Sequence, residues 1–199
     1  MTAGRKREFD KDEALKAAML VFWEKGYAGT SMADLTARMG INKPSLYATF
    51  GNKEQLHRLA LELYGQQYGG LNLVHLKDES LPIRQRVENF IKAVTELQFD
   101  NQYPTGCLVS SSATESASNN LPEDTVCAVK NMQKLTESSL IECFDQAKAA
   151  GELPKDFDSK KKATLIGLLL NGSAVMSRSG KPIEEIRAAI DLSFVFDTD

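Results

Sequence analysis

Helix-start and helix-stop signals follow one another closely in the first third of this chain, and they constrain its fold more than any other feature. Four capping residues, Asp10, Ser31, Asn42 and Asn52, each precede apolar residues at helical spacing. Glycines close the first three of these segments. Similar signals continue to the end of the chain, and no strand-like alternation or Asn-Gly hairpin interrupts them. The sequence therefore predicts an all-α fold.

The helices fall into two groups. Four of them lie within residues 1–65, and about five more lie within residues 66–199, with a looser stretch between the groups near residues 65–80. A chain of 199 residues is long enough to bury a substantial core. We expect a small N-terminal head over 1–65 and a larger C-terminal body over 66–199.

Composition narrows the function. Hydrophobic residues make up 42% and charged residues 26% of the chain, as in ordinary globular proteins. No apolar run reaches the ~18 residues of a membrane span, and the basic N-terminus lacks the apolar core of a signal peptide. Three cysteines without a CxxC pair, and only two histidines, predict no disulfide framework, metal or cofactor site. We expect a reduced, cytoplasmic protein without a membrane partner.

Residues 40–56, GINKPSLYATFGNKEQL, predict a helix-turn-helix. A glycine-containing turn joins an amphipathic helix to a short polar one, which has proline in its first turn. Lys43, Ser45, Tyr47 and Thr49 would then face outward, as residues of a helix that enters the DNA major groove do. The alternative is a helical hairpin of some bundle whose polar residues are merely solvated.

The flanking residues also suit a polyanion. Lys53 follows the cap of the fourth helix, and Thr30 and Ser31 precede the second, so each end offers free amides to a phosphate. Residues 1–60 carry ten basic and seven acidic side chains, whereas the remainder carries fourteen and twenty. This basic excess is small, but it lies in the part of the chain that is predicted to meet DNA.

Residues 26–56, GYAGTSMADLTARMGINKPSLYATFGNKEQL, closely resemble the DNA-binding domain of tetracycline-repressor (TetR) family regulators. The similarity covers about residues 10–60. Thr36 and Pro44 depart from the residues most typical of the family, and Pro44 restricts how closely the backbone can approach a base. The resemblance implies DNA contacts by Thr30, Ser31, Asn42, Lys43, Pro44, Ser45, Tyr47 and Lys53, with Arg38 as a further candidate. Thr49 is a candidate from the outward-facing pattern alone.

The same resemblance implies a homodimer built from the last two helices, and an all-α pocket for a small-molecule effector. Such a dimer represses from a pseudo-palindromic double-stranded DNA operator until the effector releases it. Small residues on the eighth helix and apolar residues on the ninth are candidates for the dimer interface, although they can equally close the core of one chain. These candidates are Gly167, Gly172, Ser173, Ile186, Ile190 and Phe194.

The stretch PTGCLVSSSATE places Cys107 at a predicted helix start. The helix dipole favours a thiolate there, and some family members with a similar Gly-Cys-Leu segment are cysteine-based sensors, so one interpretation makes Cys107 a sensor. The other makes it a small hydrophobic packing residue. Further polar candidates for the effector site are Gln98, Tyr103, Ser111, Thr114 and Glu115.

Two other classes of function fit less well. An enzyme would need Cys107 as nucleophile and His75 as base, but nothing orients that pair and no phosphate-binding glycine loop occurs. A helical interaction scaffold without DNA binding would not need Lys43, Tyr47 and Lys53 around a capped short helix. Salt dependence separates the scaffold from a DNA-binding protein, because only phosphate contacts make affinity fall steeply with salt.

Overall fold

A computed structural model describes residues 9–117 and 121–193. Nine α-helices, one π-helical turn and one 3-10 segment form the described part of the chain, and no strand occurs in it, in agreement with the predicted all-α class. The elements are α1 (Lys11–Lys25), α2 (Met32–Met39), α3 (Lys43–Phe50), α4 (Lys53–Tyr64), η1 (Gly65–Gly69), η2 (Leu71–Lys77), α5 (Ile83–Phe99), α6 (Leu108–Ala117), α7 (Glu123–Ala149), α8 (Ser159–Arg178) and α9 (Ile183–Ser193).

The first four helices begin at the residues that the capping pattern predicts. The Asp10 carboxylate accepts hydrogen bonds from two first-turn amides, and Asn42 accepts one from the amide of Ser45. Ser31 and Asn52 each form a reciprocal capping box with the residue three positions later. Such caps typically contribute about 1 kcal/mol each, which matters most for helices as short as α2 and α3.

The end of α4 changes its helical geometry. The regular α-helix ends at Tyr64, and the chain widens there into the π-helical turn η1. At Gly65 a Cβ atom would lie only 2.7 Å from the terminal methyl of Met132, so glycine permits the close approach of α7. The glycines at 65, 69 and 70 weaken regular α-helical geometry here.

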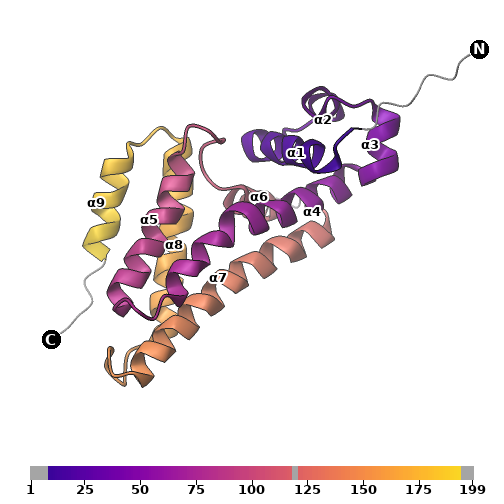
Figure 1. The fold of residues 1–199 in the computed structure, drawn as a ribbon. Coiled ribbons are helices and arrows are strands. Elements are labelled where there is room, and N and C mark those ends of the chain that lie inside the picture. The colour runs from indigo at the N-terminus through magenta and orange to yellow at the C-terminus, as the bar shows by residue number, and fades with distance from the viewer. Residues whose placement is uncertain (1–8, 118–120, 194–199) are drawn as a thin grey trace, which may run out of the picture.

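Helix α4 connects the head to the body (Figure 1). Helices α1, α2 and α3 lie at one end, α4 runs from them into the body beside α7, and α5, α8 and α9 lie at the other end. The head core contains Trp23, Leu35 and Leu46, and it continues into the body through Leu108 and Val129. A second core fills the space between α5, α7, α8 and α9.

None of the helices within residues 9–117 and 121–193 is long and apolar enough to cross a membrane.

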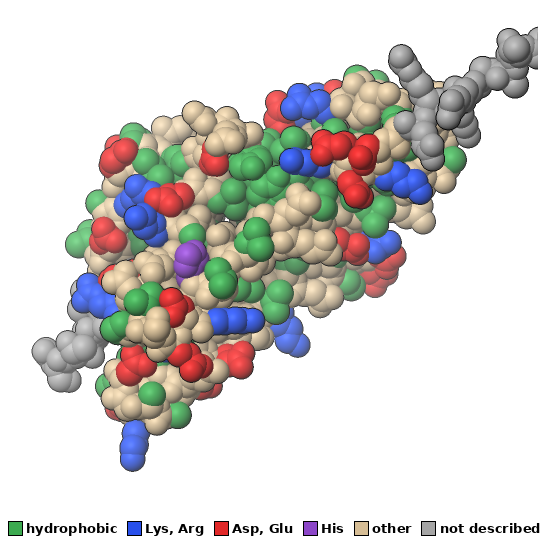
Figure 2. Space-filling model, viewed as in Figure 1, with side chains coloured by type: hydrophobic (Ala, Val, Ile, Leu, Met, Phe, Trp, Pro, Cys, Tyr) green, Lys and Arg blue, Asp and Glu red, His purple; other side chains and the backbone are tan. Residues whose placement is uncertain are grey.

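Acidic and basic side chains are intermixed over the visible surface of both head and body (Figure 2).

Candidate nucleic-acid interface and ligand pocket

Helix α3 is short, and one of its faces packs against the core of the head. Its inner residues Leu46 and Phe50 are buried, and the ring of Phe50 packs 6.3 Å from that of Phe9 between centroids. The turn before it contains Gly40 with φ of 67°, a left-handed conformation that glycine adopts without strain. The rigid support of α2 and α1 therefore fixes which face of α3 is free.

The free face of α3 carries the residues that the pattern predicts to face outward. Tyr47 is 50% exposed, Lys43 and Pro44 are exposed, and Ser45 and Thr49 are partly exposed. The carboxamide of Asn42 accepts the amide of Ser45 at 2.9 Å, so Asn42 is occupied as the helix cap. Within the described residues, neither Lys43 nor Arg38 forms an ion pair, although Lys25 pairs with Asp34 at 2.5 Å.

The residues flanking α3 divide into exposed and buried groups. Ser31 is exposed, and its hydroxyl bonds to the carboxylate of Asp34 within the capping box. Thr30 is only 2% exposed, and its hydroxyl donates to the carbonyl of Gly26. The hydroxyl of Thr30 therefore serves the turn before α2, and a DNA contact by Thr30 stays a prediction.

Lys53, at the start of α4, lies over the ring of Tyr27, with its ammonium nitrogen 4.2 Å from the ring centroid. Partial burial lowers the pKa of Lys53, and the negative charge of Glu115 opposes that shift. A cation held on an aromatic face beside the first turn of a helix can bind a phosphate with little further ordering.

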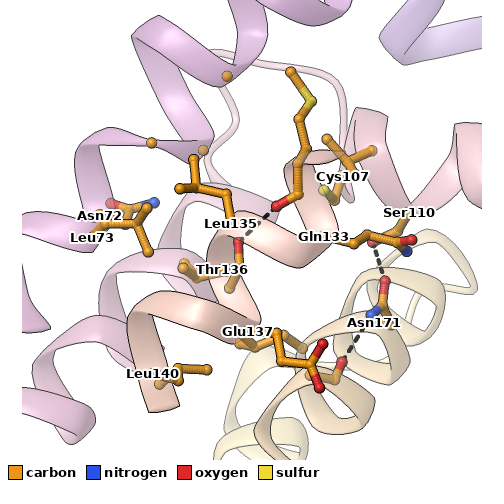
Figure 3. Close-up of a pocket in the computed structure, with 18 of the residues that line it drawn as sticks. Asn72, Leu73, Cys107, Ser110, Gln133, Leu135, Thr136, Glu137, Leu140 and Asn171 are labelled. Atoms are coloured by element: carbon orange, nitrogen blue, oxygen red, sulfur yellow. Dashed lines mark hydrogen bonds between the residues drawn. The ribbon is translucent and has the colours of Figure 1, made fainter. Parts of the chain in front are cut away.

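A cavity of about 640 Å³ lies in the body among α4, α5, α6, α7 and α8. Much of its wall is apolar, with Phe90, Val94, Leu97 and Leu140 among the residues that line it. Polar side chains also line it, and among them the hydroxyl of Ser110 donates to the Asn171 side-chain oxygen at 2.8 Å (Figure 3). Such a chamber suits a mainly apolar small molecule with one or two polar groups.

Two of the six predicted effector residues line this cavity. They are Cys107 and Gln98, and the Gln98 amide is already engaged by the carbonyl of Leu170 and the hydroxyl of Ser173. The other four lie away from its wall, which corrects the expectation for them. Tyr103 stacks on Trp23, Ser111 and Thr114 bond to carbonyls of their own helix, and Glu115 faces the head.

Cys107 lies where the pocket meets the head. Its sulfur is 3.4 Å from the hydroxyl of Tyr64, which is 2% exposed, and burial raises the pKa of Tyr64 well above its usual value. The Tyr64 hydroxyl therefore stays protonated and donates toward the sulfur. The neighbouring carbonyl of Gly106 accepts the indole N–H of Trp23 at 3.3 Å. Cys107 is thus partly exposed to the pocket and is one residue from a contact with α1.

The predicted interface residues on the last two helices separate by face. At Gly172, which is exposed, an added Cβ atom would meet open space, so this position faces outward. Gly167 also has open space beside it, but it lines the cavity. Ser173, Ile186 and Ile190 are buried in the chain itself, which corrects the expectation that they form an interface. Phe194 lies outside the described residues.

The sequence analysis missed a different set of residues on α8 and α9. Leu168 is 67% exposed and Leu192 is 81% exposed, and three further apolar side chains of α8 are exposed on the side of Leu168. With Gly172 included, positions 165, 168, 172 and 175 lie three or four residues apart and so share one face of α8. The buried apolar residues of the helix recur in the same way, so this spacing does not show which face is outward. We call this set the outer stripe: Leu165, Leu168, Val175, Met176 and Leu192.

A helix-turn-helix head joined to an all-α body is the architecture of a class of DNA-binding transcription regulators. The family profile described as "Bacterial regulatory proteins, tetR family" matches residues 14–59, and the one described as "Tetracyclin repressor-like, C-terminal domain" matches residues 84–191. The chain belongs to the TetR family.

Individual relatives agree with this assignment. The HTH-type transcriptional repressor ComR of Escherichia coli (strain K12) is 29% identical over 183 residues, which span 92% of this chain and 86% of ComR. A cysteine-substituted variant of the TetR family regulator CifR, complexed with a 26-base-pair double-strand operator DNA, is 33% identical, with a TM-score of 0.82 over 94% of this chain and 96% of CifR. Reduced NemR of E. coli shares the fold, with 20% identity and a TM-score of 0.76 over 90% of this chain and 93% of NemR.

Proposed function

We propose that this protein is a homodimeric transcriptional repressor that binds a pseudo-palindromic operator through α3. The observation that carries the proposal is the free polar face of α3, which rests on a buried core and presents Lys43 and Tyr47 outward. Two such helices in a two-fold dimer must lie about 34–36 Å apart to enter successive major grooves.

Contacts to DNA follow from where the side chains lie. Lys43 and Tyr47 face the groove, and Lys53 meets a phosphate from the start of α4. Ser45 and Thr49 are close enough to the free face to reach phosphates or base edges. The remaining contacts, by Ser31, Arg38, Asn42 and Pro44, frame the helix on both sides.

The outer stripe supplies the dimer interface. Five exposed apolar side chains on α8 and α9 form a surface that water disfavours, and Gly172 lets a partner helix approach closely there. An interface of this kind places a two-fold axis along the far end of the body from α3 (Figure 1).

The effector is a mainly apolar small molecule that occupies the 640 Å³ cavity, or an electrophile that modifies Cys107 on its wall. Either kind of effector releases the operator by favouring a conformation in which the two α3 helices of the dimer have a different spacing. A differential affinity of a few kcal/mol is enough to shift the population appreciably.

The protein acts as a regulator and not as an enzyme, in keeping with its relatives, and it works in the cytoplasm. The DNA-binding head spans 1–65, and the effector-binding and dimerisation body spans 66–199.

Fluorescence anisotropy tests this function. The purified protein is titrated onto labelled DNA from just upstream of its own gene and onto a scrambled duplex, from about 50 to 200 mM salt. We expect selective binding that weakens steeply as salt rises. Binding that is insensitive to salt would contradict the proposal, because phosphate contacts release counterions.

A further inference from the structure

The carboxylate of Glu115, near the end of α6, binds the head. Its two oxygens accept hydrogen bonds from the backbone amides of Tyr27 and Ala28, each at 2.9 Å. These amides belong to the turn that joins α1 to α2, 87 and 88 residues away in sequence. Because both oxygens are used on adjacent amides, the contact fixes the direction of the turn as well as its distance.

Gly26 makes room for this contact. It has φ of 72°, and a Cβ atom there would lie 2.8 Å from one carboxylate oxygen of Glu115. The glycine that ends α1 is therefore also the residue that lets α6 reach the head.

The other end of α6 holds the head at a second point. Gly106, which precedes α6 by two residues, accepts the indole N–H of Trp23 near the end of α1. Arg178 of α8 reinforces the junction, donating to the carbonyl of Thr105 at 3.0 Å and to that of Trp23. Contacts at both ends of α6 thus hold the end of α1 and the turn that follows it. The pocket residue Cys107 lies beside one of these contacts.

The contact at Glu115 is connected to the DNA-binding face through Tyr27. Tyr27 donates its amide to Glu115 and carries Lys53 over its ring. The turn that Glu115 holds also runs directly into Thr30 and Ser31 at the start of α2. A rotation of α6 therefore moves both the residues that cap α2 and the Tyr27 ring over which Lys53 lies.

We propose that Glu115 is a positioning residue that fixes the orientation of the DNA-binding head and transmits to it the state of the pocket at Cys107. The transmission part rests on the proposed function above, and the positioning part stands on the contacts alone. Glu115 itself does not touch DNA in this scheme.

Operator affinity of unmodified variants tests the positioning. Glu115→Ala removes both acceptors, and Glu115→Gln keeps one. We expect the alanine variant to bind the operator about tenfold more weakly, with the glutamine variant between it and wild type. Thr114→Ala is the matched control, because Thr114 is exposed and bonds only to its own helix. Tighter binding by both Glu115 variants would overturn the proposal, since it would mean that Glu115 acts only through its charge.

The transmission is tested with N-ethylmaleimide in a Cys127→Ser background, where Cys107 is the accessible thiol because Cys143 is buried. Trp23, the single tryptophan, reports locally by its fluorescence. We expect alkylation to shift Trp23 emission with or without Glu115, but to weaken operator binding only when Glu115 is present. Equal weakening in the Glu115→Ala variant would overturn the inference. Unchanged operator binding in the background itself would refute Cys107 as the sensor, and the affinity order of the unmodified variants would still decide the role of Glu115.

Discussion

The imidazole of His57 meets the ring of Phe22 edge-on, with centroids 4.6 Å apart, at the centre of the contact between α4 and α1. Neither imidazole nitrogen has a hydrogen-bond partner among the described residues, and the side chain is fully buried. Burial, together with the nearby charge of Lys53, lowers the pKa of His57 from 6.5 to about 4. The head is therefore built around a neutral histidine.

Stability should fall as the pH drops through the window between these two values. The unfolded chain takes up a proton on His57 below pH 6.5 and the folded chain does so only near pH 4, so acid favours unfolding there. We expect His57 to account for about 2 kcal/mol of lost stability between pH 7.5 and pH 5. Urea unfolding of wild type and His57→Phe at the two pH values measures this, and an equal loss in both proteins would show that other groups cause it.

Removing a proposed DNA contact should weaken binding in a way that depends on its partner. Lys53→Ala and Tyr47→Ala should weaken binding to every duplex, and Lys53→Ala should lower the salt slope by about one. Lys43→Ala should also reduce discrimination between operator variants, by about 1–3 kcal/mol if it contacts a base. Anisotropy on matched and mismatched duplexes measures both effects. Lys77→Ala, an exposed lysine of η2, is the control, and wild-type binding by all three variants would mean that another face meets DNA.

A charge on the outer stripe should separate the dimer. Leu168→Glu places a carboxylate in the outer stripe, at a position that is 67% exposed in the single chain and would be buried in the proposed dimer. We expect a monomer by sedimentation velocity and at least about tenfold weaker operator binding, since one recognition helix loses its partner. Val74→Glu, at a position 62% exposed on η2, should stay dimeric. A dimer that survives Leu168→Glu would locate the interface elsewhere.

Cys107→Ser should keep the operator affinity of wild type within about twofold and abolish release by N-ethylmaleimide, because serine is nearly isosteric but far less nucleophilic. Cys127→Ser should remain sensitive, since Cys127 lies exposed on α7 away from the pocket. Anisotropy before and after alkylation measures release. Continued release of the Cys107→Ser protein would assign the response to another group.

Helix ends were predictable because the signals that set them are local. Asn42 and Asn52 cap the helices that follow them through atoms only three residues away. The outward face of α3 was predictable for the same reason, since eight residues in a helix have one face against the core and one face away from it.

The division of α8 was not predictable, because the helix is apolar on two faces. Ile166 and Leu170 face the core, whereas Leu168 and Val175 face outward, and nothing in their side chains distinguishes the two sets. The role of Glu115 could not be predicted either, because its partners are more than 80 residues away in the sequence. Its polarity suggested an effector site, but the fold directs it to the head.

The outer stripe also ties the behaviour of the protein to the amount of it in the cell. If two chains must meet before two recognition helices can reach one operator, the quantity of active protein varies with the square of the monomer concentration when monomers prevail. Halving synthesis then leaves about one quarter of the dimer. The apolar side chains of α8 and α9 would thus make the regulated promoter respond to gene dosage more sharply than a single-chain repressor could.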